Sequence, residues 1–164
     1  MKTLMLVRHA KSSWADFGQA DFDRPLNERG KRDAPAMAGF LKNKQIQIDA
    51  FVSSPAKRAK KTCKAFCEVY GYDKDEIIFI EKLYHASKDT FESVVEDLFD
   101  DHDRVAIFSH NPGITEFANS LSPEVHLDNM PTCAVFAVQA DVERWADFNA
   151  AKKEFLFFET PKTG

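Results

Sequence analysis

The short stretch formed by residues 3–12 constrains the fold of this chain more than any other. Its apolar run Leu4-Met-Leu-Val7 ends abruptly in Arg8 and His9. A buried parallel strand that delivers polar side chains to its carboxyl edge has this pattern, and in open α/β sheets that edge is where ligands bind. An imidazole can attack phosphorus and a guanidinium grips phosphate oxygens, so the stretch indicates phosphate chemistry. The alternative is a surface loop without chemistry.

The same pattern returns twice further along the chain. Residues 46–52 read as a second buried strand, and Ser54 or Pro55 then begins a helix that carries Arg58 in its first turn. A later strand, residues 104–109, ends directly before His110. Because the carboxyl ends of parallel strands share one edge of a sheet, we expect Arg8, His9, Arg58 and His110 to converge there.

The remaining elements complete an α/β fold. We expect a three-layer sandwich in which a mostly parallel sheet is flanked by helices, with antiparallel pairing near the end of the chain. The apolar spacing predicts helices after Asn27, from about Lys88 to Phe99 and over 114–121. It predicts further strands over 77–80, 133–138 and 144–148, the last two as a hairpin that turns near Asp141, while 155–158 is an edge strand or an apolar tail.

Length and charge restrict the function classes. A chain of 164 residues fits one domain, residues 1–164, with a sizeable core. The formal net charge of −4 argues against nucleic-acid binding, which usually needs a basic surface, so we expect any anion site to be local.

Cysteine content and hydropathy bear on the compartment. Three cysteines, Cys63, Cys67 and Cys133, are an odd number without dense spacing, so we expect buried core residues in a reducing compartment. The apolar run at Leu4 is too short for a signal peptide, and no stretch approaches a membrane span. We therefore expect a cytoplasmic protein without a membrane partner.

A long polar segment, residues 11–25, follows the first strand and is expected to form a loop over its edge. Three aromatic residues lie in it, Trp14, Phe17 and Phe22. We expect them to pack as apolar pegs that hold the loop down, because aromatic side chains mostly contribute buried area. The alternative is that they stack on a substrate.

The four converging residues suit phosphoryl transfer. His9 is the expected nucleophile, which would form a phosphohistidine that water then hydrolyses. Arg8, Arg58 and His110 would contact the equatorial oxygens and stabilise their developing charge. Backbone N–H groups near Asn111 could add to this.

Several strings of the sequence resemble the histidine phosphatase superfamily, which has the phosphoglycerate mutase-like fold. The resemblance is strongest to its short branch, the SixA-like phosphohistidine phosphatases, and extends from about residue 3 to Trp145. It implies a phosphatase that needs neither metal nor cofactor, with His9 as the phosphate acceptor. The strings are residues 8–14, 23–30, 53–59, 83–84, 110–113 and 130–132.

This chain departs from the sugar-phosphate branches of that family. Ala10 follows His9 where those branches have Gly, Ala15 falls near the place of an Asn, and no Glu occupies the position of the acid that protonates a leaving alcohol. An imidazole leaves more readily than an alkoxide without such an acid. The departures therefore favour phosphohistidine in a protein as the substrate, although His85 or Asp89 could still serve as an acid.

Three alternatives remain open at this stage. The first is a phosphomonoesterase of the same fold that acts on small molecules, and the second is a phosphate-binding module without catalysis. The third is a metal site built from His9, His85, His102 and His110, although no ligand spacing supports it. The expected partner is a phosphorylated protein or a phosphorylated small molecule.

Overall fold

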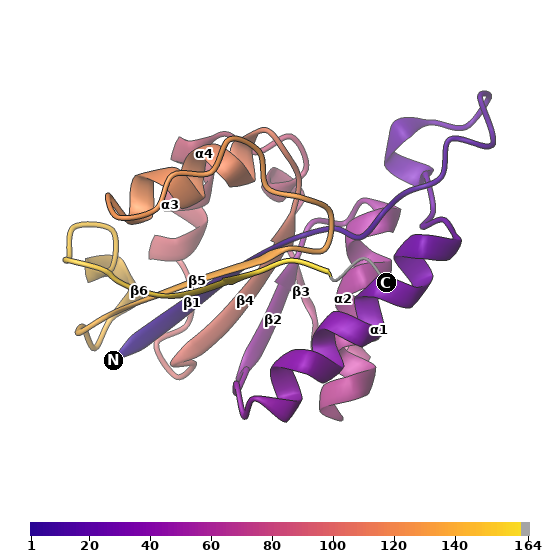
Figure 1. Ribbon diagram of the computed structural model, residues 1–164. Coiled ribbons are helices and arrows are strands. Elements are labelled where there is room, and N and C mark those ends of the chain that lie inside the picture. The colour runs from indigo at the N-terminus through magenta and orange to yellow at the C-terminus, as the bar shows by residue number, and fades with distance from the viewer. Residues whose placement is uncertain (162–164) are drawn as a thin grey trace.

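A six-stranded sheet runs through the centre of the computed structural model, which describes residues 1–161 (Figure 1). Its strand order is β3-β2-β4-β1-β5-β6. Strands β1 to β4 are mutually parallel, whereas β5 is antiparallel to both β1 and β6, as the sequence predicts. The strands are β1 (Lys2–Arg8), β2 (Ala50–Ser53), β3 (Ile78–Phe79), β4 (Arg104–Ser109), β5 (Val135–Ala140) and β6 (Glu154–Glu159).

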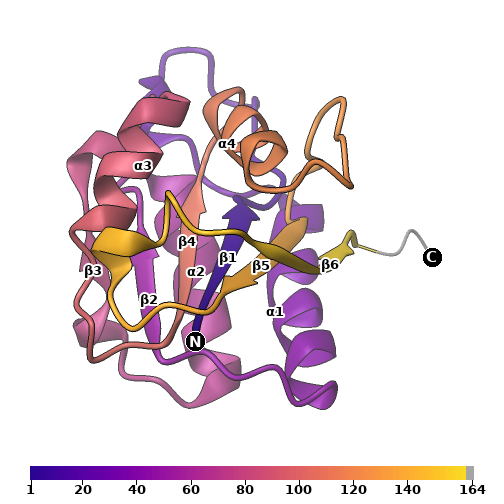
Figure 2. The ribbon, with the colours of Figure 1, turned by 90° about the vertical axis from the view of Figure 1, so that its left-hand side faces the viewer.

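Two pairs of helices cover the two faces of the sheet, which gives the predicted three layers (Figures 1 and 2). Successive residues of β1 point to opposite faces, so Leu4 and Leu6 pack on one side and Met5 and Val7 on the other. The first side is covered by α3 and α4, and the second by α1 and α2. The helices are α1 (Glu28–Asn43), α2 (Lys57–Tyr70), α3 (Lys88–Glu96) and α4 (Gly113–Leu121).

Local signals place helix α1 as expected. The Asn27 side chain accepts a hydrogen bond from the backbone N–H of Gly30 at 2.8 Å, which caps the first turn. Gly30 also lets the helix approach the loop closely, because a Cβ there would lie 2.2 Å from the carbonyl oxygen of Lys11. The segment after Pro25 therefore has two roles: Asn27 caps the helix, and Gly30 packs against the loop.

Several predicted boundaries are wrong. Strand β2 begins at Ala50 rather than residue 46, and α2 begins at Lys57, after both Ser54 and Pro55. Strand β3 keeps only two residues, and α3 ends at Glu96 instead of Phe99. Each difference lies at the end of an element, where a local sequence pattern locates the boundary least precisely.

The predicted hairpin over 133–148 is also wrong. Residues 145–147 form a short 3₁₀ turn, η4 (Trp145–Asp147), and β5 pairs with β6 instead. The indole N–H of Trp145 donates to the carbonyl oxygen of His102 at 2.7 Å, and its ring is fully buried. Trp145 is therefore an apolar residue buried in a turn, which the sequence pattern does not distinguish from a buried strand residue. Residues 155–158 lie within the edge strand β6, one of the two predicted alternatives.

The loop after β1 contradicts the expectation that its aromatic residues act as pegs. Phe17 is 95% exposed and Trp14 66% exposed, whereas Phe22 packs edge-on against Tyr84 at 5.2 Å between ring centroids. Within the loop, residues 21–23 form a short 3₁₀ turn, η1 (Asp21–Asp23). The loop is held down by polar contacts instead, which belong to the site described below. Two further 3₁₀ turns are η2 (Lys74–Glu76) and η3 (Glu81–Leu83).

The structure also tests the expectations about the cysteines and about membrane-spanning helices. Cys63, Cys67 and Cys133 are free thiols buried in the core, as expected. Within residues 1–161, none of the helices has both the length and the apolar character needed to cross a membrane.

Candidate active site

His9 lies directly after β1, at the carboxyl edge of the parallel strands, and is 6% exposed. Its Nδ1 lies 2.8 Å from the carbonyl oxygen of Ala10, which can only accept a hydrogen bond, so Nδ1 carries the proton. The other ring nitrogen, Nε2, accepts from the Nε of Arg58 at 3.4 Å. The backbone thus leaves the lone pair of Nε2 turned toward Arg58.

The surroundings of His9 keep its ring neutral. Burial is the main cause that lowers the pKa of His9, to about 3, and the charges of Arg58 and Arg8 lower it further, although the hydrogen bond to Ala10 acts in the opposite direction. A neutral imidazole has a free lone pair at physiological pH. The geometry therefore presents Nε2 as a nucleophile.

His110 follows β4 and faces His9, with 5.2 Å between the ring centroids. Its Nε2 lies 2.8 Å from the hydroxyl of Ser54, at the end of β2. Its Nδ1 is buried and has no hydrogen-bond partner among residues 1–161. Burial, followed by the electrostatic influence of His9 and Arg58, lowers the pKa of His110 to about 2. A buried nitrogen without a partner fits a ligand atom that is bound during function.

The two arginines approach the same place from different elements. Arg8 ends β1 and donates through Nη1 to the carbonyl oxygen of Met130 at 2.9 Å, while its buried Nε has no partner among residues 1–161. Arg58 lies in the first turn of α2 and is 5% exposed. Burial and the charge of Arg58 both lower the pKa of Arg8. Two guanidinium groups close to His9 favour a bound anion, although the carboxylate of Asp21 already pairs with Arg58.

Asp21 forms one wall of this site and was missed by the sequence analysis. The Nη1 of Arg58 donates to its carbonyl oxygen at 2.7 Å and Nη2 to its carboxylate at 3.1 Å, while the hydroxyl of Tyr84 donates to the same carboxylate at 2.6 Å. Burial alone would raise the pKa of Asp21, but the Tyr84 hydrogen bond and the Arg58 charge outweigh it and lower the pKa well below its usual range. The only signal in the sequence was its place in the polar loop.

A pocket of about 250 Å³ borders His110. His85 lies in it with a left-handed backbone (φ 63°), and its ring packs against that of Tyr84 at a tilt of 38°, with 3.9 Å between centroids. Glu116, which the sequence analysis did not consider, lines the same pocket, whereas Asp89 does not. Of the two acids considered from the sequence, only His85 therefore borders His110.

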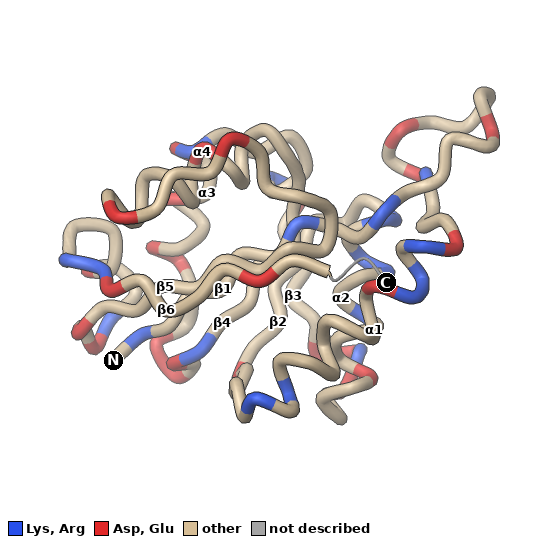
Figure 3. Tube along the Cα trace, viewed as in Figure 1, with Lys and Arg blue, Asp and Glu red and all other residues tan. Residues whose placement is uncertain are grey.

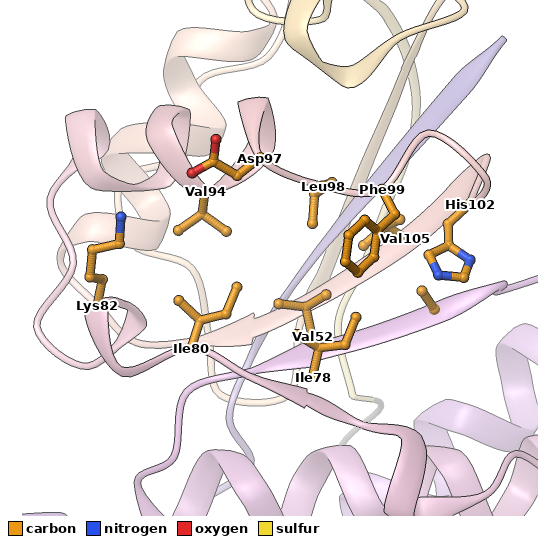
Figure 4. A pocket seen from close by; sticks show the side chains of 11 residues that line it. Val52, Ile78, Ile80, Lys82, Val94, Asp97, Leu98, Phe99, His102 and Val105 are labelled. Carbon is orange, nitrogen blue, oxygen red and sulfur yellow. The ribbon is translucent and has the colours of Figure 1, made fainter.

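The four histidines of the proposed metal site do not meet. His102 lines an apolar pocket near the amino ends of β2 and β4 (Figure 4), whereas His9 and His110 lie at the carboxyl ends of the strands. Within residues 1–161, no three His, Cys, Asp or Glu side chains are grouped so that they could hold a metal ion. The metal alternative thus has no set of ligands in the part of the chain described here.

Comparisons with known proteins identify relatives of this arrangement. The family model of the histidine phosphatase superfamily (branch 1) matches residues 4–86. An uncharacterized protein of Mycobacterium tuberculosis is 29% identical over 165 residues, which covers 95% of this chain and all of the relative. Phosphoserine phosphatase 1 of Hydrogenobacter thermophilus is 37% identical over 86 residues, 49% of this chain and 40% of the relative.

A solved structure agrees over the whole length. A candidate phosphohistidine phosphatase, SixA of Agrobacterium tumefaciens, superimposes with a TM-score of 0.81 at 25% identity, covering 98% of this chain and 99% of that protein. The match includes the antiparallel strands at the end of the chain, which lie beyond the family model. The α/β fold with its mixed sheet is therefore that of SixA-like structures.

Proposed function

The chain belongs to the histidine phosphatase superfamily, and from this premise we propose that it hydrolyses phosphohistidine in a protein partner, without a metal ion. The observation that supports this most directly is the placement of His9. Its unprotonated Nε2 accepts from the Nε of Arg58 at 3.4 Å, and the ring of His110, whose buried Nδ1 has no partner among residues 1–161, lies 5.2 Å away between centroids.

The proposed reaction has two steps. Nε2 of His9 attacks phosphorus, the bond between phosphorus and the substrate imidazole breaks, and the phosphoryl group is transferred to His9. Water then attacks the phosphorus of this intermediate and releases inorganic phosphate. Arg8 and Arg58 hold the oxygens throughout, and His110 donates from Nδ1 to one of them.

The leaving group supports a phosphoramidate substrate. The position at which sugar-phosphate branches carry their acidic Glu is occupied by the segment 83–85, whose Tyr84 hydroxyl is already committed to Asp21. A substrate imidazole takes up a proton near neutral pH, so its bond to phosphorus breaks without a dedicated acid. An alkoxide would need one.

Trapping the intermediate tests this proposal. The protein is incubated with radiolabelled phosphoramidate, quenched in alkali, digested, and analysed for the labelled residue. We expect the label on His9, none in the variant His9→Gln, and an unchanged yield in the matched variant His102→Gln, whose ring lies in the other pocket. A label on another residue, or full turnover by His9→Gln, would refute the mechanism. Turnover that survives a chelator supports independence from metal.

A phosphomonoesterase is the second candidate, and two observations favour it. A relative is a phosphoserine phosphatase, and Glu116 and His85 border His110 where an acid could protonate a leaving alcohol. The ratio of kcat/KM for phosphohistidine to that for phosphoserine separates the two candidates. We expect a ratio well above one, and a ratio below one would favour the phosphomonoesterase.

A further inference from the structure

The loop formed by residues 13–22, here named the aromatic loop, is anchored at both of its ends. Next to its start, Ser12 bridges to Leu26, and the backbone N–H of Ser13 donates to the carbonyl oxygen of Pro25 at 2.8 Å. Arg24 donates to the hydroxyl of Ser12 at 2.6 Å and lies 3.6 Å from the ring centroid of Trp14. The ends of the loop are therefore held in place, and its tip extends from them.

The tip exposes large apolar side chains. Phe17 is 95% exposed, and Trp14, although Arg24 covers one face of its ring, is 66% exposed. Figure 1 shows the loop standing out from the body of the molecule beyond the end of β1. Water around such rings is displaced favourably when another apolar surface covers them, yet no part of the described chain covers Phe17.

The aromatic loop is continuous with the active site. Its Asp21 accepts hydrogen bonds from both Arg58 and Tyr84, and its Phe22 packs against the ring of Tyr84. The loop therefore rises from the wall of the phosphate site itself. A phosphoryl group bound next to His9 and Arg58 lies beside this wall, and a molecule much larger than the phosphoryl group would extend toward the tip.

The surface beside the site is basic although the chain is acidic overall. Lys57, which precedes Arg58 in α2, and Lys61, one turn later, are exposed and have no ion-pair partner among residues 1–161. In Figure 3, basic segments lie where the loop meets α1 and α2, with acidic segments among them and on the loop itself. Such charges attract acidic groups on a partner. The surface thus combines exposed aromatic rings with unpaired positive charge.

We propose that the aromatic loop is a docking surface for the protein that carries the phosphorylated side chain, and that it contacts apolar residues flanking that side chain while Lys57 and Lys61 face acidic ones. This inference rests on the proposed function, since it assigns the substrate class of the same site. An aromatic anchor beside a polar rim is a common arrangement at protein interfaces.

Binding of short peptides tests the docking surface separately from catalysis. Two labelled peptides carry the same stable phosphoryl-triazole analogue of phosphohistidine and the same flanking glutamates. One has leucines around the analogue, and the other has serines at those positions. We expect the wild-type protein to bind the leucine peptide about tenfold more tightly in fluorescence anisotropy, the effect of burying part of one aromatic side chain. We expect Phe17→Ser to lose most of this preference.

A matched control is available in Phe99, which is 66% exposed and borders the apolar pocket near the opposite ends of the strands (Figure 4). Phe99→Ser should keep the preference of the wild-type protein. Equal affinity of the wild-type protein for the two peptides, or an undiminished preference in Phe17→Ser, would overturn the docking proposal.

Hydrolysis of phosphoramidate reports on the proposed function alone. We expect the wild-type protein and both variants to hydrolyse it at similar rates, because so small a substrate does not reach Phe17. Absence of hydrolysis in the wild-type protein, together with a leucine preference in binding, would reject the proposed function and keep the docking surface.

Discussion

The surroundings of His9 and His110 lower the pKa of both imidazoles and so favour neutral rings near physiological pH. His9 donates its Nδ1 proton to the carbonyl oxygen of Ala10, which leaves Nε2 unprotonated for the proposed attack on phosphorus. Ser54 accepts from the backbone N–H of Ala56 at 3.2 Å and lies 2.8 Å from Nε2 of His110. We propose that its hydroxyl donates to Nε2, which would put the proton of His110 on Nδ1, where it can be donated to phosphate.

The first prediction concerns Ser54. Ser54→Ala removes the donor that selects this tautomer, so we expect the turnover of phosphoramidate to fall about tenfold, the usual effect of one hydrogen bond near charge. Nitrogen NMR of labelled histidine should show His110 changing from protonated Nδ1 to a mixture of tautomers. Ser54→Thr, which keeps the hydroxyl, should restore both readings. An unchanged spectrum of Ser54→Ala would show that another group sets the tautomer.

The second prediction concerns anion binding and pH. Without an anion, the pKa values of His9 and His110 are lowered to about 3 and about 2, and a bound dianion raises both because opposite charge favours the protonated ring. Binding then takes up protons, so the affinity for sulfate should rise as the pH is lowered from 7.5 to 5. Sulfate keeps its charge over this range, so calorimetry reports on the protein groups. Affinity that is constant across this range would contradict the expected rise in these pKa values.

At the scale of elements, the relative position of β1 and α2 depends on a buried hydroxyl. The Thr62 hydroxyl donates to the carbonyl oxygen of Arg58 at 2.8 Å and accepts from the backbone N–H of Ala10 at 2.9 Å. It therefore connects the turn that carries Arg58 to the end of β1, next to the proposed nucleophile His9. The sequence analysis did not identify this connection.

The third prediction tests that connection. Thr62→Val keeps the shape and leaves the N–H of Ala10 buried without a partner, which costs about 1–3 kcal/mol of unfolding free energy. We also expect a lower kcat, because the spacing between Arg58 and His9 depends on this contact. Urea denaturation and steady-state kinetics measure the two effects, and Thr62→Ser should be close to the wild-type protein. Thr62→Val with unchanged stability and kcat would exclude this role.

The fourth prediction concerns the first residue of α4. A Cβ at Gly113 would lie 1.8 Å from the backbone carbonyl oxygen of Ala86, so the two backbones approach as closely as only glycine permits. Gly113→Ala should separate α4 from the segment that carries Tyr84 and His85, lowering both the melting temperature and the turnover. Gly39→Ala, in the interior of α1 with no atom within 4 Å, is the control; it should leave turnover unchanged and raise the melting temperature slightly, because Ala favours a helix more than Gly does. A melting temperature of Gly113→Ala equal to that of the control would contradict the close approach.

At the scale of the whole molecule, the site places cationic and neutral basic groups in the interior of an acidic protein.

The fifth prediction follows from the two histidines. In the unfolded chain they bind protons below about pH 6.5, whereas the folded protein keeps them neutral until about pH 3 and 2. Their contribution to stability is therefore present above pH 6.5 and is lost as the pH falls, by up to about 1.4 kcal/mol per pH unit for each group.

Denaturation by urea between pH 7.5 and 4.5 measures this loss. The double variant His9→Asn with His110→Asn cannot take up these protons, so its unfolding free energy should fall less steeply toward acid than that of the wild-type protein. Equal slopes would show that other groups control acid stability.

By itself, the sequence determined the α/β class, the mostly parallel sheet and the residues at the carboxyl ends of its main strands, because each depends on a local pattern of apolar and polar residues. His9, His110 and Arg58 converge as predicted, since parallel strands end at one edge. The strand predicted over 144–148 is wrong, because an apolar residue such as Trp145 can be buried in a turn as well as in a strand, and the local sequence does not distinguish the two.

Only the tertiary structure decided which side chains complete the site. Asp21 meets Arg58 across 37 positions, and Ser54 meets His110 across 56. Such partners are selected by how the loop and the strands pack, and nothing in their own neighbourhoods marks them. The exposure of Phe17 was decided in the same way, because an aromatic residue in a polar loop becomes a peg or a docking residue according to whether the rest of the chain reaches it.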